Sequence, residues 1–180
     1  MGQEWEVVLQ MMLDLGVDIN DAQGTKHATA LEAVVKKSVD SDRDQDQEKL
    51  VSRTRFLLEK GANANTHVGP FGSVLHYLCS HPFIEDTYVQ CYVSRNPVLE
   101  FFLNWPGIDV NAEGGIYGTA LQASAAAGDC LSVEQLLRRG ADVNLRCGKY
   151  GSALNAAIIK GYWHIVEVLL DAGALPDCRH

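Results

Sequence analysis

The chain has 180 residues, of which 47% are hydrophobic and 21% are charged, and these proportions are typical of a folded globular protein rather than a disordered one. The formal net charge of −8 at pH 7 argues against binding to nucleic acid or to an anionic membrane, because either would repel the chain, and leaves a basic partner open. No apolar run approaches the roughly 20 residues that a membrane-spanning helix needs, and the acidic N-terminal sequence lacks the pattern of a secretory signal.

The first predicted element is a helix over Trp5–Leu15, which is followed by the turn sequence Gly16–Asn20. A glycine followed four residues later by an asparagine recurs at Gly61–Asn65, Gly107–Asn111 and Gly140–Asn144. Recurrence of this kind indicates a repeat protein. Residues 1–20 are therefore predicted to be the second helix and exit loop of a partial first repeat.

Two longer units follow, and each opens with a hydroxyl residue before a short apolar stretch, at Thr29–Ala33 and Ser73–Tyr77. The closing asparagines lie 45 residues apart from Asn20 to Asn65 and 46 apart from Asn65 to Asn111. The units 21–65 and 66–111 are thus predicted to be 33-residue repeats that carry insertions, at about 38–49 and 81–97, between their two helices.

The first insertion, SVDSDRDQDQEK, is acidic, and its one apolar residue is Val39. Such a composition is typical of a solvated loop or of a polar extension of the following helix. A docking site for a basic partner is the alternative.

The second insertion, HPFIEDTYVQCYVSRNP, is rich in aromatic and β-branched residues that would be costly to expose together. Ile84, Tyr88 and Tyr92 recur every four residues, as on one face of a helix, although an extended conformation fits the segment equally well. The segment either folds back onto its own repeat or forms a patch for a partner or for self-association, and Tyr88 and Tyr92 are candidates for that patch. Asn96-Pro97 is predicted to cap and begin the next helix.

The two C-terminal units, 112–144 and 145–177, align without a gap at an offset of 33 residues. The stretch from Tyr117 to Gln122 (YGTALQ) corresponds to Tyr150–Asn155 (YGSALN). Its hydroxyl residue is a natural N-cap, the alanine-rich stretch after it predicts a short helix, and a glycine at 128 or 161 ends that helix. A second apolar helix and a projecting turn complete the unit.

These motifs resemble the ankyrin-repeat family, whose pattern is Thr-Pro-Leu-His-x-Ala with a Gly-Ala-Asp-Val-Asn ending. The chain replaces the proline throughout and keeps the family's histidine at His76, whereas Glu32, Gln122 and Asn155 stand at the equivalent positions. The variant Tyr-Gly-Thr-Ala-Leu-Gln resembles arrays in multidomain proteins of filamentous fungi. The resemblance implies an all-α solenoid of helix-turn-helix units over residues 1–180, in which the turns and first helices line a concave protein-binding face. It also implies that His76 bonds to the neighbouring turn.

The projecting turns hold the other candidate partner-binding residues, because side chains there vary at little cost to stability. These candidates are Phe71, Ile116, Tyr117, Lys149 and Tyr150. An aromatic residue just before the glycine of the turn has a second possible role, which is to cover the contact between repeats.

Catalysis, cofactor binding and metal binding are not expected. The cluster His76, Cys79 and His81, with Cys91 further on, has irregular spacing for a zinc site and lacks the context of a nucleophile. The glycines are all explained by helix ends and turns, so no phosphate-binding loop is predicted.

The ends of the array are apolar where a terminal repeat should be polar. Ile158, Ile159, Val166 and Val168 lie in the last unit. Trp163 is predicted to pack there, and the alternative is that it serves as a binding anchor. Either the chain is a segment of a longer array or its ends are covered by self-association.

The sequence thus predicts a protein-binding or scaffolding module without enzymatic activity. Five scattered cysteines without CxxC spacing favour free thiols and an intracellular location, cytoplasmic or nuclear. The alternatives are a regulatory or sensor array of a larger multidomain protein and, in a third class, a binder of small molecules or metal.

Overall fold

The structure is a computed structural model, and it describes residues 4–21, 29–40, 44–81 and 96–176. Its regular elements over these ranges are helical: α1 (Glu4–Asp14), α2 (Ala30–Asp40), α3 (Asp44–Glu59), the 3-10 turn η1 (Gly69–Phe71), α4 (Val74–Ser80), α5 (Pro97–Leu103), α6 (Ala120–Ala127), α7 (Cys130–Arg138), α8 (Ala153–Lys160) and α9 (Trp163–Asp171).

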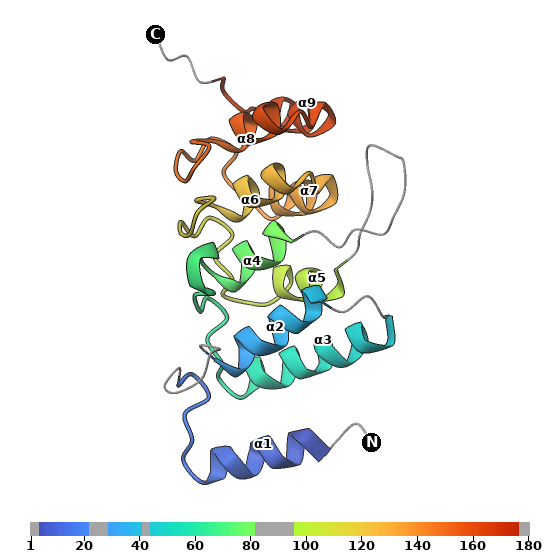
Figure 1. The fold of residues 1–180 in the computed structure, drawn as a ribbon, viewed down its shortest axis with the longest axis vertical. Helices are drawn as coiled ribbons and strands as arrows, with labels where there is room; N and C mark the ends of the chain where they lie inside the picture. The colour runs from blue at the N-terminus through green and yellow to red at the C-terminus, as the bar shows by residue number, and fades with distance from the viewer. Residues whose placement is uncertain (1–3, 22–28, 41–43, 82–95, 177–180) are drawn as a thin grey trace.

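The helices from α2 to α9 form four pairs that stack in layers along one axis, with α1 at one end of the stack and α9 at the other (Figure 1). One row of helices, which we call the inner row, consists of α2, α4, α6 and α8, each in contact with the next. The outer helices α3 and α5 contact each other, as do α7 and α9. The predicted all-α solenoid is confirmed.

Local sequence explains where the helices begin and end. The hydroxyl of Thr119 accepts a hydrogen bond from the backbone amide of Gln122 at 3.2 Å, and the Ser152 hydroxyl accepts one from Asn155 at 3.1 Å. Gly128, with φ of 83°, ends α6 in the left-handed conformation that glycine adopts most readily. These predicted caps are confirmed.

Small side chains in the inner row allow neighbouring layers to approach closely. Helix α6 (ALQASAAA) is buried from Ala120 to Ala126, and α8 buries four of its residues. Larger side chains that are almost fully buried fill the space between the layers: Phe102, Leu57, Leu78, Leu121, Leu136, Leu154 and Leu169. A single helix pair could not bury these side chains alone, so the core exists only in the stack.

The first insertion is mostly helical. Helix α2 continues to Asp40 and α3 begins at Asp44, so the prediction of a polar helix extension is confirmed for residues 44–49 and the loop alternative is wrong there. The buried Gln47 side chain donates a hydrogen bond to the carbonyl of Ser38 at 2.8 Å and so ties the two helices together.

The second insertion falls largely outside the described residues, and so do the candidates Tyr88 and Tyr92. Its end is described. The Asn96 side chain accepts hydrogen bonds from the amides of Val98 and Leu99 at 3.0 and 3.2 Å, and Pro97 is the first residue of α5. The predicted cap at this position is confirmed.

The packing of the last layer corrects one prediction. Trp163 is 66% exposed and does not pack at the end of the stack as predicted. Helix α9 buries Ile165, Val166 and Leu169, and Trp163, as its first residue, lies outside that stripe. Ile159 is also exposed, so this end of the stack carries apolar side chains on its surface.

The recurring asparagines form a ladder between layers. The Asn111 amide donates to the carbonyl of Gly140 at 3.2 Å, and its oxygen accepts from the amide of Asp142 at 2.7 Å. Asn20, Asn65 and Asn144 make the corresponding pairs of bonds to the turns that begin at Gly61, Gly107 and Gly173. Each asparagine therefore fixes the spacing between its own turn and the next one.

Replacing Asn111 by alanine is expected to lower the free energy of unfolding by about 1–2 kcal/mol, because two hydrogen bonds between layers are lost. Urea unfolding measures this difference. Asn63→Ala is the matched control, since the Asn63 side chain accepts a hydrogen bond within its own turn, from the amide of Asn65 at 3.0 Å. Equal losses in the two variants would show that the ladder adds nothing to ordinary turn stability.

Candidate interaction surface

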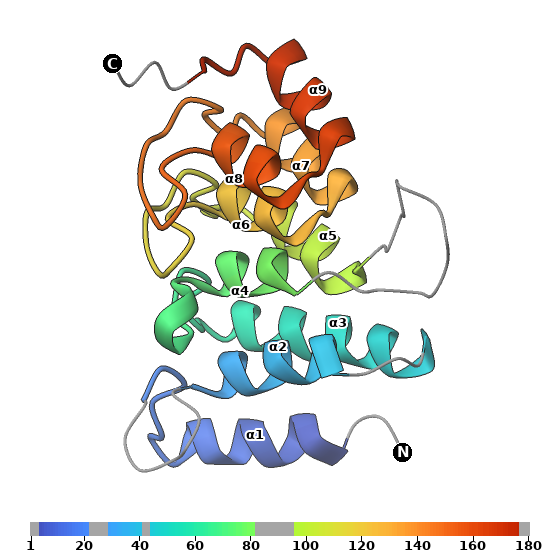
Figure 2. The same ribbon diagram turned by 45° about the horizontal axis from the view of Figure 1, so that its top comes forward.

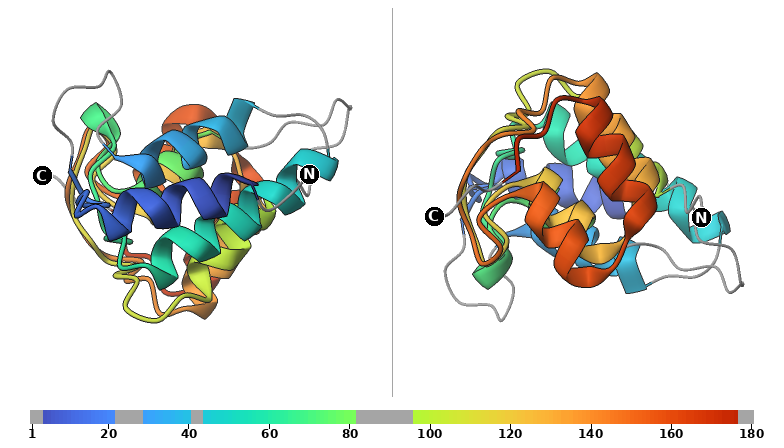
Figure 3. Two further views of the ribbon diagram at one scale, coloured as in Figure 1. Left: turned by 90° about the horizontal axis from the view of Figure 1, so that it is seen from below. Right: turned by 90° about the horizontal axis from the view of Figure 1, so that it is seen from above.

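Three turns project from the same side of the stack, next to the inner row (Figure 2). They comprise residues 66–73, 112–119 and 145–152, and we call their outer residues the tip row. Each turn is closed by an antiparallel bridge: His67 with Ser73, Gly114 with Gly118, and Cys147 with Gly151. Viewed along the stack, the turns overlie one another (Figure 3, right).

Backbone hydrogen bonds join the tips to one another. The amide of Ile116 donates to the carbonyl of Pro70 at 3.0 Å, and the amide of Lys149 donates to the carbonyl of Ile116 at 2.9 Å. Glycine is required where the turns meet: a Cβ at Gly115 would overlap the backbone of Phe71, and one at Gly148 would overlap the backbone of Tyr117. Backbone hydrogen bonds and close contacts therefore join the three tips of the tip row into one continuous surface.

Polar side chains of the inner row attach each turn from beneath. His76 Nδ1 accepts from the Ser73 amide at 3.1 Å, so Nε2 carries the proton that is donated to the carbonyl of Gly118, also at 3.1 Å. Burial lowers the pKa of His76, which keeps the imidazole neutral. The role that the family resemblance implied for His76 is confirmed.

Gln122 makes the equivalent attachment one layer further on. Its side-chain nitrogen donates to the carbonyl of Leu145 at 3.0 Å and to that of Gly151 at 3.3 Å. Its oxygen accepts from the amide of Thr119 at 3.3 Å, which completes a capping box. Replacement of the family's histidine by glutamine thus preserves the contact between layers.

The predicted turn residues fall into two groups. Ile116, which is 46% exposed, and Lys149 lie outward on the tips, at the points where the backbone bonds join them. Tyr117 and Tyr150 are half-buried and stack on each other with ring centroids 6.4 Å apart. The two tyrosines therefore cover the contact between repeats, and binding of a partner by any of these residues stays a prediction.

Phe71 also packs within its own layer. Its ring meets the edge of Tyr77 at 5.4 Å and of His81 at 5.1 Å between centroids. It remains half-buried, so part of the ring borders the tip row. These ring contacts lie within its own repeat, so for Phe71 both the covering of the contact between repeats and the binding of a partner stay predictions.

Sequence reasoning missed three surface positions of the tips: Pro70, Glu113 and Arg146, all exposed. The signal was available, because Pro70 corresponds to Ile116 and Lys149 when the turns are aligned, and Glu113 corresponds to Arg146. The tips thus combine an apolar centre with charges of both signs.

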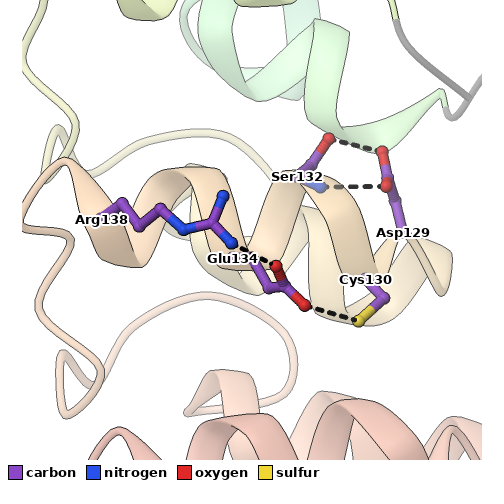
Figure 4. A network of polar contacts seen from close by, with 5 residues as sticks. All are labelled: Asp129, Cys130, Ser132, Glu134 and Arg138. Atoms are coloured by element: carbon purple, nitrogen blue, oxygen red, sulfur yellow. Dashed lines mark hydrogen bonds and ion pairs between the residues drawn. The ribbon is translucent and has the colours of Figure 1, made fainter. Parts of the chain in front are cut away.

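A second polar network lies on α7, away from the tips (Figure 4). Asp129 caps that helix by accepting from the Ser132 amide at 3.0 Å and from the Ser132 hydroxyl at 2.5 Å, and burial raises the pKa of its carboxyl. Glu134 accepts from Arg138 at 2.6 Å and from the thiol of Cys130 at 4.0 Å. These contacts stabilise α7, and each carboxylate has its partner within the helix.

The residues first considered as metal ligands lie in separate environments. His76 is engaged by Ser73 and Gly118, whereas the ring nitrogen Nδ1 of His81 is 3.0 Å from the Tyr77 carbonyl. Cys79 is fully buried, which raises the pKa of its thiol to about 12 and keeps it protonated. No group of three His, Cys, Asp or Glu residues in the described ranges is arranged to hold a metal ion.

Within the described residues, no helix combines the length and the apolar character that spanning a membrane requires.

Comparison with known proteins agrees with this geometry. A family model described as ankyrin repeats (3 copies) matches residues 88–180, just over half of the chain. A solved ankyrin repeat domain from Acinetobacter baumannii AYE superposes with a TM-score of 0.70 at 23% sequence identity, covering 99% of this chain and 81% of that one. At that identity the likeness shows a shared fold. No curated protein matched the sequence.

Proposed function

Because the chain belongs to the ankyrin-repeat family, whose members are generally protein–protein interaction modules, we propose that it binds a partner protein through the tip row and the adjoining inner helices. The observation that carries the proposal is the exposed Ile116, held by backbone hydrogen bonds between Pro70 and Lys149. Ankyrin repeats typically act without catalysis, and the role proposed here needs none.

The rigidity of the tip row supports this assignment. Both bonds of Ile116 to its neighbours are backbone bonds, and the turns approach so closely at Gly115 and Gly148 that a Cβ there would overlap the neighbouring backbone. A surface ordered before binding loses little conformational entropy when the partner arrives. An apolar centre surrounded by charged groups is also the usual composition of a protein-binding site.

The cellular setting and the domain organisation are part of the proposal. Among the described cysteines, Cys79, Cys130 and Cys147 are free thiols, which fits a reducing intracellular compartment and a scaffolding role there. We assign residues 1–180 to one domain with a partial repeat followed by four repeats, and this division agrees with the four helix pairs beyond α1.

The test is affinity capture from native cell extract, followed by titration of the purified partner with the wild type and with Ile116→Ser/Lys149→Glu. Loss of a central apolar residue and reversal of its neighbour's charge are expected to weaken binding at least tenfold, equivalent to about 1.4 kcal/mol. Both side chains are exposed, so thermal unfolding should change little.

Leu170→Ser is the matched control, because Leu170 on the outer helix α9 is 46% exposed, the same fraction as Ile116. A captured protein that binds the tip variant as tightly as the wild type, or that is lost in both variants, would contradict binding at the tip row.

A further inference from the structure

Charge is divided unevenly between the two sides of the stack. Among the side chains that the structure describes, those of α1, the outer helices and the turns that follow them include thirteen acidic and six basic residues, a balance of −7. The inner helices and the turns ahead of them (29–40, 66–81, 112–127 and 145–160) hold two acidic and five basic residues, a balance of +3. The acidic ones are Glu32 and Glu113, and the basic ones are Lys36, Lys37, Arg146, Lys149 and Lys160.

One position at the C-terminal end of the inner helices is repeatedly basic. The residue that lies eight positions after the N-cap of each inner helix is, in chain order, Lys37, His81, Ala127 and Lys160. Equivalent positions of stacked repeats line up along the stack, so we call these four residues the inner column. Its two lysines are exposed, and its histidine and alanine are half-buried.

The inner column and the tip row border the inner row at opposite ends. The projecting turns lead into the N-terminal ends of the inner helices, whereas the inner column lies in their last turns or directly after them (Figure 2). On the tips, the ammonium of Lys149 lies 5.5 Å over the ring of Tyr150, next to the exposed Ile116. Positive charge therefore occupies both borders of the proposed binding surface.

The two carboxylates of this side do not cancel that charge. Glu32 is 2% exposed, and its carboxylate is 2.5 Å from the ammonium of Lys36, so the two charges neutralise each other. On the tips, the charge of Glu113 offsets that of Arg146, which occupies the equivalent position of the next turn. The exposed excess consists of Lys37, Lys149 and Lys160.

Local charge governs what approaches this surface, although the formal net charge of the whole chain is −8. At physiological ionic strength the Debye length is about 8 Å, so exposed charges on the far side of the stack are largely screened from a group that meets the inner row. The net charge left a basic partner open, whereas the placement of the charges favours an acidic one at this surface.

We propose that the partner protein presents an acidic segment to the inner row. Its carboxylates meet Lys149 and the lysines of the inner column, and an apolar side chain covers Ile116. This inference rests on the proposed function and specifies the chemistry of the partner. A protein segment suits the surface better than nucleic acid, because Pro70 and Ile116 are apolar and the exposed Glu113 would repel phosphate groups.

The stack also sets the length of that segment. Lys37 lies in the first of the four layers and Lys160 in the last. Packed helices lie about 8–10 Å apart, so three layer spacings amount to about 24–30 Å. An extended segment of about eight or nine residues spans that distance.

The first test needs no partner. Two small nitroxide radicals of equal size, one with a carboxylate and one with an ammonium group, are added in turn to the wild type, and NMR records the faster relaxation of each amide proton. The anionic radical is expected to act about twofold more strongly than the cationic one at Lys37, Lys149 and Lys160. The opposite order is expected on the outer side, at Glu100, Glu167 and Asp171. Equal or reversed ratios on the two sides would overturn the proposal.

The second test measures the association rate of the captured partner at low and at high salt. Lys37→Glu/Lys160→Glu should slow association about tenfold at low salt and little at high salt, because these charges steer the encounter and salt screens them. Lys49→Glu/Lys60→Glu is the matched control, since it reverses two exposed lysines on and directly after the outer helix α3. Equal slowing by both pairs would mean that only the net charge acts, and would overturn the proposal.

The outcomes distinguish this inference from the proposed function. A partner that Ile116→Ser/Lys149→Glu releases, but that Lys37→Glu/Lys160→Glu binds at the wild-type rate, would keep the tip row as the site and overturn the acidic segment. A single-stranded oligonucleotide is titrated as the competing ligand. Its binding to the wild type, with loss in Lys37→Glu/Lys160→Glu, would assign the inner row to nucleic acid and overturn the proposal.

Discussion

Replacing Gly148 by alanine is expected to destabilise the chain by about 3 kcal/mol and to detach the last turn from the tip row. Gly148 has a φ of +63°, which is unfavourable for alanine, and the new Cβ would overlap the carbonyl group of Tyr117. Backbone cannot rotate aside as a flexible side chain does, so the whole turn must move. The hydrogen bond from Lys149 to Ile116 would be lost with it.

Urea unfolding and hydrogen exchange at the Lys149 amide measure these effects. Gly140→Ala is the control: its φ of +83° carries the same backbone penalty, but nothing lies within 4 Å of a Cβ there. It should cost about 1 kcal/mol. If the two substitutions cost the same, the close approach of the turns is absent in solution.

Replacing His76 by alanine is the second large effect, with an expected loss of about 2–4 kcal/mol. The substitution leaves the buried Gly118 carbonyl and the Ser73 amide without their partner and opens a cavity under the turn. His76→Gln is expected to cost less than about 1 kcal/mol, because Gln122 already makes this type of attachment in the next layer.

The pH dependence of these variants follows from the pKa of His76. Burial lowers that pKa below its ordinary value of 6.5, so the unfolded chain takes up a proton before the folded chain does. The contribution of His76 to stability is therefore complete above pH 6.5 and is lost as the pH falls from there through the folded pKa. His76→Gln removes this loss.

The measurement is the difference in the free energy of unfolding between wild type and His76→Gln from pH 7.5 to 5. Taking the difference cancels the contributions of the other histidines. The free energy of unfolding of the wild type, relative to that of His76→Gln, should fall as the pH is lowered. A difference that stays constant with pH would show that His76 is not buried as a neutral ring.

The helices and their caps could be predicted because the information is local. A hydroxyl residue before an alanine-rich stretch and a glycine after it specify α6 and α8, whatever lies around them. The helical first insertion was harder to assign, since its cross-connection depends on Gln47 reaching a carbonyl nine residues earlier. The composition of the segment does not show that these two residues lie within hydrogen-bonding distance.

The sequence predicted which residues lie in the projecting turns, but it did not predict the hydrogen bonds that join one turn to the next. The 33-residue offset identified Ile116, Tyr117, Lys149 and Tyr150 as turn residues. The offset could not show that the amide of Ile116 bonds to the carbonyl of Pro70, because every residue has backbone groups and their bonding is not visible in the sequence. The three residues that meet at the tips, Pro70, Ile116 and Lys149, also differ in side chain. The exposure of Trp163 was missed for a related reason, since its place on α9 relative to the apolar stripe depends on where that helix begins.

The asparagine ladder gives the protein a particular mechanical character. Each asparagine connects its layer only to the next layer. A force applied to the two ends is therefore expected to separate the layers one at a time, over several similar small energy barriers rather than one large barrier. Under tension the chain would lengthen stepwise, and after release it would rewind onto whichever layers had stayed closed. A molecule built this way is expected to extend like a spring, in which the four asparagines act together with the packed core and the hydrogen bonds between the turns.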